Sequence, residues 1–370
     1  MGRPIYRRPI YRRPIYLAMP VSDCFGAGTC GKYLTQEFMK RGRVFNHLMG
    51  ECLDDEPLSN VIPKTLTSDV DIPLIQFAGS ELEQQTKYRG SPNVAYIFSE
   101  WEPITEEQKR NLRAFDVLVA GSEWNARVIR DAGFECAAVP QGVDRAIFRP
   151  LPRTEFQDRF VIYSGGKFEY RKAQDLVIRA VKILQERHPD ILLVSSWFNI
   201  FGGNDGMTEA LSAGIDFVPL PLLNHRELAR RMAQTNVGLF PNRREGGTNL
   251  ILMDYLAMGK PVIANVSTGQ RDVLHESYAR MIEGDDDALV DQMVEHVEAL
   301  YIKPDEIERM GAAASVVMHG WSWSRTAEGL LEAIRSWESK RESKRGVTHA
   351  NHQAVKSAGE VSPEHGVPAL

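Results

Sequence analysis

Apolar and polar positions alternate in blocks along the first 140 residues of this chain. Apolar runs of strand length occupy residues 15–19, 72–77, 93–98, 117–120 and 137–140. Stretches with helical periodicity follow several of these runs, at residues 105–114 and 123–132 and, after a glycine turn at 26–31, up to about residue 40. Strands that alternate with helices predict a parallel sheet with helices on both faces.

The alternation stops at residues 141–158, which contain two prolines, and then starts again. In the second half, strands are predicted at 160–164, 191–195, 216–220, 237–240 and 261–264, and helices at 172–187, 226–234, 248–258, 286–300, 305–318 and 324–337. In the first of these helices the apolar positions share one face, as a helix against a sheet requires. The pattern therefore predicts an α/β protein of two doubly wound, Rossmann-like domains whose strand ends face each other across a cleft, where ligands bind.

The expected organisation has six parts. These are a flexible basic leader (1–12), a first domain (13–145), a linker (146–158), a second domain (159–320), a final helix (321–337) and a disordered tail (338–370). The leader repeats the unit RPIYR, and its regularly spaced prolines prevent an amphipathic helix. A flexible leader without a binding partner is therefore preferred. The alternative is a leader in weak peripheral contact with an anionic membrane surface.

Composition narrows the class of protein. The 370 residues carry a net charge of −5, which argues against nucleic-acid binding by the chain as a whole. The four cysteines lack C-x-x-C spacing, so reduced thiols are expected rather than a disulfide or zinc site. No apolar run approaches the about 18 residues that would span a membrane, and no secretory signal is visible. A cytoplasmic location is expected, with a peripheral position at the inner face of the membrane as the alternative.

Residues 240–264 form the most informative segment. It contains a strand end, a glycine turn, a helix, a glycine stop and another strand, with Glu245 before the helix and Asp254 within it. A helix that starts at a glycine turn offers free backbone N–H groups and a positive dipole end to an anion. Carboxylates beside a phosphate site can hold hydroxyls, so the segment predicts a nucleotide-sugar site.

A second segment, residues 163–180, supports this interpretation. A strand leads into Gly165 and Gly166, followed by Lys167 and, where the next helix is predicted to start, Lys172. Cations at a helix N-terminus are unfavourable for helix stability. An anion such as a diphosphate between the two lysines would explain them, whereas solvated loop lysines are the alternative for Lys172 taken alone.

Together, the two segments resemble the donor-binding domain of family 4 glycosyltransferases, retaining enzymes of the GT-B fold. Lys167 and Lys172 match the two basic positions of that family, Glu245 and Asp254 match the two acids of its E-x7-E signature, and Gly-Lys-Pro-Val-Ile-Ala follows them. By pattern, the resemblance covers roughly residues 13–337 and is most specific in the second domain.

The resemblance implies a role for each matching residue. Lys167 and Lys172 would hold the donor diphosphate and stabilise the leaving nucleoside diphosphate, and Glu245 would hydrogen-bond the sugar and complete the catalytic set. Asp254 would accept from the ribose hydroxyls, and the final helix would pack back on the first domain. The other expected donor-binding residues are Gly165, Gly166, Gly246, Gly247, Thr248, Asn249 and Leu250.

Two departures from the family pattern stand out. Asp254 replaces a glutamate and lies nine positions after Glu245, one more than usual, because the Gly-Gly-Thr-Asn turn is longer. Many relatives also carry a histidine near the reacting centre in the first domain, whereas this chain has none between His47 and His188. Another group must then orient the sugar or take the acceptor proton.

The first domain offers weaker candidates for the acceptor side. Gly28 belongs to the glycine turn at 26–31, and Glu100 and Trp101 follow a predicted strand end, where cleft residues lie. Glu100 could bind an acceptor hydroxyl and Trp101 could stack on a sugar, while ordinary packing and rim structure are the alternatives. Asp285–Asp287 and the acids at 69 and 71 resemble a metal motif, but helix capping explains the former, and no metal and no cofactor are expected.

The expected function is a retaining, metal-independent glycosyltransferase of the hexosyltransferase type, active in glycan biosynthesis. It would move a sugar from a nucleotide-diphosphate sugar to a saccharide, a lipid-linked or a small-molecule acceptor. Two alternatives stay open: a nucleotide-sugar epimerase on the same fold, and a non-catalytic donor-binding partner subunit.

Overall fold

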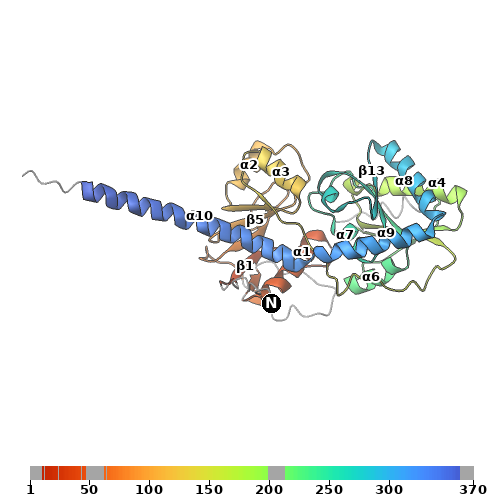
Figure 1. Cartoon of the computed structure of the whole chain (residues 1–370), viewed down its shortest axis with the longest axis horizontal. Coiled ribbons are helices and arrows are strands. Elements are labelled where there is room, and N and C mark those ends of the chain that lie inside the picture. The colour runs from red at the N-terminus through yellow and green to blue at the C-terminus, as the bar shows by residue number, and fades with distance from the viewer. Residues whose placement is uncertain are drawn as a thin grey trace, which may run out of the picture.

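The computed structural model describes residues 11, 13–23, 25–42, 44–46, 62–63, 65–198 and 213–358, with the side chains at 62–63 and beyond 343 left out. Two α/β domains lie side by side, and the last helix starts between them and extends past the first domain (Figure 1). Most of the predicted leader lies outside the described residues, as do Cys24 and Cys52.

The first domain is built on a seven-stranded parallel sheet with the order β3-β2-β1-β4-β5-β6-β7. Its strands are β1 (Ile15–Ala18), β2 (Val44–Asn46), β3 (Ile62–Pro63), β4 (Leu74–Phe77), β5 (Asn93–Ile97), β6 (Val117–Ala120) and β7 (Ala137–Ala138). Its helices are α1 (Gly26–Met39), α2 (Glu106–Leu112) and α3 (Glu123–Asp131). Strand β2 and the edge strand β3 were not predicted, because three and two residues are too few for a periodic pattern.

The second domain repeats this plan with a six-stranded parallel sheet of order β10-β9-β8-β11-β12-β13. Its strands are β8 (Phe160–Lys167), β9 (Ile191–Phe198), β10 (Phe217–Pro219), β11 (Val237–Phe240), β12 (Val262–Asn265) and β13 (Ala279–Ile282). Its helices are α4 (Gln174–Arg187), α6 (His225–Ala233), α7 (Leu250–Ala257), α8 (Asp286–Tyr301) and α9 (Pro304–Val317), with short 3-10 turns η1 (Tyr170–Lys172), η2 (Thr268–Val273) and η3 (Met318–Gly320).

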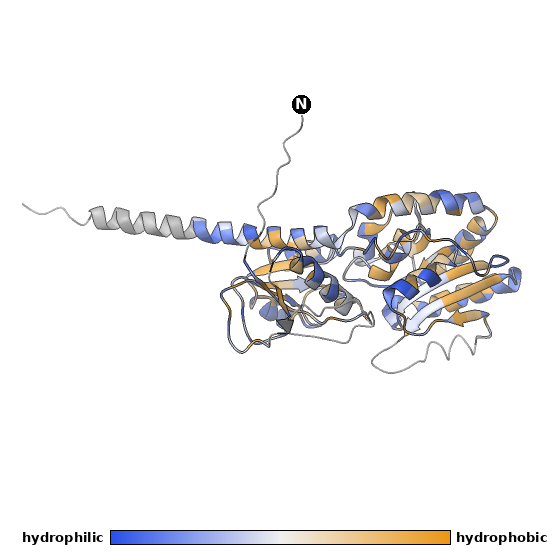
Figure 2. Ribbon diagram, turned by 90° about the horizontal axis from the view of Figure 1, so that it is seen from below, coloured by the Kyte–Doolittle hydropathy of each residue, from blue (hydrophilic) through white to orange (hydrophobic). Residues whose placement is uncertain are grey.

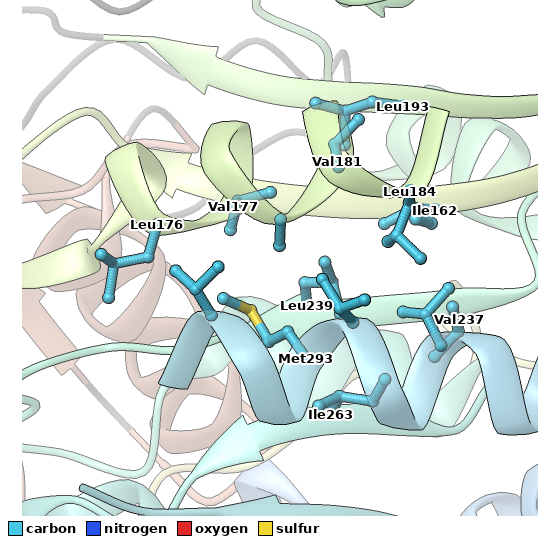
Figure 3. Close-up of a cluster of buried hydrophobic side chains, with 14 of the residues drawn as sticks. Ile162, Leu176, Val177, Val181, Leu184, Leu193, Val237, Leu239, Ile263 and Met293 are labelled. Atoms are coloured by element: carbon cyan, nitrogen blue, oxygen red, sulfur yellow. The ribbon is translucent and has the colours of Figure 1, made fainter. Parts of the chain in front are cut away.

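The core of the second domain shows why the apolar periodicity predicts these elements. Leu176, Val177, Val181 and Leu184 on α4 face the sheet beside Met293 of α8, as Figure 3 shows. The two longest strands beneath them, β8 and β9, begin with continuous apolar runs at 160–163 and 191–194, because both faces of a parallel sheet are covered (Figure 2).

Two chain segments connect the domains and lie next to each other. Val143 pairs with Ser322 in an isolated parallel bridge, and its N–H donates to the carbonyl of Trp321 at 3.0 Å. Helix α10 (Trp323–Ala358) then packs on the first domain, where Leu330 and Ile334 share a buried cluster with Leu17 of β1. The polypeptide thus crosses between the domains twice at one place.

The predicted disordered tail is wrong for residues 338–358, which continue α10 to Ala358. The residues after Trp337 are mainly Glu, Lys, Arg and Ser, and no proline or glycine occurs before Gly346. Glutamate, lysine and arginine have high helix propensity, and oppositely charged residues one turn apart add to it.

Candidate active site

A cavity of about 580 Å³ lies between the carboxyl ends of the two sheets and takes its lining from both domains. From the first domain come Asp23 after β1, the start of α1, Phe77 after β4 and Glu100 after β5. From the second come the ends of β8 and β9 and the starts of α6 and α7. Volume and position are those of a small-molecule site in an open α/β sheet.

Two lysines of the second domain lie at the edge of the cavity near Glu245. Strand β8 ends at Lys167, and η1 brings Lys172 to the same edge of the cavity, where its ammonium forms an ion pair with Glu245. Lys167 forms an ion pair with Glu169. The structure thus brings together the three residues predicted to be catalytic, Lys167, Lys172 and Glu245, in one cavity.

Arg171 is a third cation at this position that sequence reasoning missed. Its guanidinium lies 2.9 Å from Glu100, 2.8 Å from Glu169 and 3.3 Å from Glu245. The contact with Glu100 crosses from the second domain to the first. The basic pair Arg171-Lys172 was a signal in the sequence, but only the fold shows that both side chains point into the cavity.

Burial and the neighbouring charges shift the pKa values of several of these groups. Burial raises the pKa of Glu245, but the charges of Lys172 and Arg171 outweigh burial and hold that pKa below its ordinary value. Burial lowers the pKa of Lys172, although Glu245 opposes it. For Glu100, burial outweighs the nearby charge of Arg171 and raises the pKa to about 7. Three carboxylates thus balance three cations, and an incoming diphosphate would compete with those carboxylates.

The glycine turn before α7 presents its backbone to the cavity. Asn249 has a left-handed conformation (φ 62°), no side chain caps the helix, and the first turn of α7 has no acidic residue. Gly247, Asn249 and Leu250 line the cavity as predicted donor-binding residues. The free N–H groups of such a helix start suit a phosphate.

Three of the predicted donor-binding residues lie behind the cavity surface instead. Thr248 is fully buried, and its hydroxyl donates to the sulfur of Met253 at 2.9 Å. Gly246 packs so closely on the carbonyl of Phe98 that a side chain would overlap it, and Gly165 is similarly covered by Tyr163 and Ser196. These residues support the turn, while Gly166, with a φ of 119°, does line the cavity.

Asp254 faces the cavity from α7 and is only 8% exposed. Burial, with a smaller contribution from Asp144, raises its pKa well above the ordinary value. Among the described residues no hydrogen bond or ion pair of its carboxyl is found. A buried carboxyl without a partner is unfavourable, so ligand hydroxyl groups would satisfy it.

Of the first-domain residues predicted to bind the acceptor, some line the cavity and others do not. Glu100 lines the cavity, but Trp101 is 56% exposed, lies under the guanidinium of Arg244 at 5.2 Å and is not part of the lining. Gly28 packs against Ser22, and its neighbours Gly26 and Ala27 line the cavity instead. The direction of a side chain at a strand end depends on packing, which residue spacing alone does not reveal.

A buried polar group at the domain boundary also escaped prediction. Asp23 and Lys32 of the first domain form a buried ion pair at 2.8 Å. The Tyr33 hydroxyl lies 3.0 Å from Nδ1 of His225 on α6, although 192 positions separate them in the sequence. His225 and Asp23 both line the cavity. The first domain lacks the expected histidine, and the structure places one beside it from the second domain.

Within the described residues, no group of three His, Cys, Asp or Glu side chains could hold a metal ion. Asp285 caps α8 through the N–H of Ala288, and Asp286 pairs with Arg243 at 2.8 Å. Nor does the described part of the chain contain a helix long and apolar enough to cross a membrane.

Comparison with known proteins agrees with the resemblance of the second domain to glycosyltransferases. Residues 159–299 match the family described as glycosyl transferases group 1. A D-inositol 3-phosphate glycosyltransferase of Arthrobacter sp. (strain FB24) is 30% identical over 210 residues, which cover 53% of this chain and 49% of that protein. A GDP-mannose-dependent monoacylated alpha-(1-6)-phosphatidylinositol monomannoside mannosyltransferase of Corynebacterium glutamicum is 26% identical, covering 60% and 62%. The match to the first of these relatives spans about half of its length.

Solved structures extend the likeness to both domains. Sucrose-phosphate synthase from Thermosynechococcus elongatus superposes with a TM-score of 0.67 at 16% identity, over 89% of this chain and all of that one. The Anabaena protein HepE, in complex with UDP and glucose, gives 0.61 at 13% identity, over 87% and 99%. At such identities the likeness establishes the arrangement of the two domains.

Proposed function

We propose that this chain transfers a sugar from a nucleoside-diphosphate donor to an acceptor hydroxyl. Residues 159–299 match the group 1 glycosyl transferases, and the two domains have the GT-B fold. One observation carries the proposal: Lys167, Lys172, Glu245, Asp254 and the open start of α7 surround a single cavity.

The chemistry suits these groups. In the transfer, the bond from the anomeric carbon to the diphosphate oxygen breaks and a bond to the acceptor oxygen forms, while the acceptor hydroxyl loses its proton to the departing diphosphate or to solvent. The transition state resembles an oxocarbenium ion, and negative charge grows on the leaving group. Lys167, Lys172 and the N–H groups of α7 are placed to stabilise that charge. Glu245 and Asp254 would hold the hydroxyls of the sugar and the ribose.

We further propose that transfer retains the anomeric configuration and needs no metal ion, because two lysines, Arg171 and a helix end already supply positive charge. The stereochemistry follows from the family resemblance and is tested by NMR of the product. Transfer that persists in EDTA would support metal independence, and a loss restored by Mg²⁺ or Mn²⁺ would refute it.

The proposal does not yet specify which compound accepts the sugar. Relatives are named for inositol phosphate and for a phosphatidylinositol mannoside, so both kinds belong in an acceptor panel together with neutral saccharides. Peripheral contact with a membrane is a further proposal, tested by co-sedimentation with anionic vesicles.

The decisive experiment is a thermal-shift screen against nucleotide sugars, because a ligand that binds only the folded state raises the melting temperature by mass action. The stabilising donor is then incubated with and without acceptors. Glycosylated product supports the proposal, whereas a new nucleotide sugar formed from donor alone would indicate an epimerase. Donor binding without any turnover would indicate a non-catalytic subunit.

A further inference from the structure

The first-domain side of the cavity differs from the donor side in its chemistry. Phe25, Phe77 and Phe98 line it, and these three residues are here called the phenyl wall. The rings of Phe77 and Phe98 stack with centroids 5.6 Å apart. Phe77 is the last residue of β4 and Phe98 follows β5, the adjacent strand, and the carboxyl ends of both strands open on the cavity. All three side chains are only partly buried, so apolar surface is available to a ligand.

The charged groups on this side are acidic. Its lining residues within the described part of the chain include Asp23 and Glu100 but no lysine, arginine or histidine. Among the described residues, the lysines and arginines of the lining all come from the second domain, where Lys167, Arg171 and Lys172 surround the predicted diphosphate position, and the one lining histidine, His225, also belongs to that domain. A phosphate on the acceptor would therefore face three phenyl rings and two carboxylates, Asp23 and Glu100, whose ion-pair partners Lys32 and Arg171 are already engaged. It would lose its hydration unless it displaced one of these carboxylates from its partner.

The start of α1 does not alter this conclusion. Its first turn has no acidic residue and faces the cavity at Gly26 and Ala27, so it could attract an anion. However, a Cβ on Gly26 would lie 3.9 Å from a methyl group of Leu250, the first residue of α7. The starts of α1 and α7 therefore converge on one place, the site proposed for the donor diphosphate.

We infer that the acceptor is an uncharged hydroxyl compound with an apolar aryl or alkyl group and without a phosphate. The inference rests on the proposed function and specifies its acceptor class. The apolar group contacts the phenyl wall, and Ser80 and Gln141, which also line this side, are neutral partners for acceptor hydroxyls.

The test uses three probes: phenyl β-D-glucoside, octyl β-D-glucoside and inositol 3-phosphate. Their binding is measured by calorimetry with the nucleoside diphosphate that stabilises the chain most, so that the donor side is filled. We expect both glucosides, or one of them, to bind at least about tenfold more tightly than inositol 3-phosphate, a difference of about 1.4 kcal/mol. Which glucoside binds better distinguishes an aryl from an alkyl acceptor.

Variants of the wall locate the binding. Phe77→Ala should weaken glucoside binding about tenfold, the upper end for loss of an aromatic contact. Phe134→Ala, a partly buried phenylalanine of the same domain outside the cavity, should leave it unchanged. Phe77→Leu keeps apolar volume if the alanine variant unfolds, and it should weaken the phenyl probe more than the octyl probe if an aryl group is bound.

Equal or tighter binding of inositol 3-phosphate would overturn the inference, and so would absent glucoside binding or a Phe77 series without effect. These results leave the proposed function intact as long as a nucleotide sugar stabilises the chain. Failure of that donor screen would instead count against the function itself.

Discussion

The two sides of the cavity are built in different ways. The donor side uses two short continuous segments, residues 164–173 and 245–254, each of which forms a turn that leads into a helix. The first-domain side uses single residues at the ends of separate strands, such as Asp23, Phe77 and Glu100. Donor binding thus depends on local backbone geometry, and acceptor choice depends on side chains that only the sheet brings together.

Lys172→Ala tests the donor side with the largest expected effect. Loss of one group that stabilises the leaving charge should lower kcat by about 10²- to 10³-fold. Lys182→Ala, an exposed lysine of α4, is the matched control and should retain full activity. A folded Lys172→Ala protein with normal kcat would remove Lys172 from the catalytic set.

Asp254→Asn separates binding from stability. A carboxyl whose folded pKa is raised disfavours folding once the unfolded group ionises, so at pH 7 the neutral amide should leave the melting temperature equal or higher. Donor binding should nevertheless weaken up to about tenfold, because the amide changes the hydrogen bonding to the ribose and an ordinary hydrogen bond contributes about 0.5–1.5 kcal/mol. A donor lacking the ribose hydroxyls should show no difference between variant and parent, and a difference there would contradict the ribose assignment.

The bridge between Glu100 and Arg171 joins the two sides and predicts a pH effect. The pKa of Glu100 is raised to about 7, so the carboxyl gains a proton as the pH falls through that value and releases Arg171. The affinity for a nucleotide sugar, whose diphosphate does not titrate here, should then rise by up to about fivefold, the range of a partly exposed ion pair. Glu100→Gln should bind with the higher affinity at both pH 6 and pH 8, and an unchanged pH profile in this variant would refute the bridge as its source.

Trp101→Ala should have the smallest effect. Its ring is largely exposed and outside the cavity lining, so both donor affinity and kcat should change less than about twofold, as for most surface substitutions. A strong effect on acceptor KM alone would show that the acceptor reaches the rim of the cavity.

Much of the fold followed from local pattern. The long strands and the amphipathic helices of the second domain were predicted because apolar residues recur at the period of each element, as in α4. Strands β2 and β3 escaped because they are too short, and the extension of α10 escaped because its highly charged sequence resembles a disordered tail.

In the candidate site, too, local spacing predicted some residues correctly and tertiary packing decided others. Lys167, Lys172, Glu245 and Asp254 could be named from spacing, because a glycine turn followed by a helix determines locally where its N–H groups and adjacent side chains lie. Thr248 and Gly246 belong to the same turn but point inward or pack on Phe98, which spacing could not reveal.

By itself, the sequence determined two doubly wound domains and pointed to the proposed site for a nucleotide-sugar diphosphate, since both depend on residues close together along the chain. Tertiary structure alone decided that Arg171 reaches Glu100, that His225 meets Tyr33 and that three phenylalanines form one wall. Each of these contacts joins distant segments, and its existence depends on how the sheets twist and how the domains pack. The proposed donor site can therefore be recognised in the sequence, whereas the proposed acceptor class rests on side chains that only the folded cleft brings together.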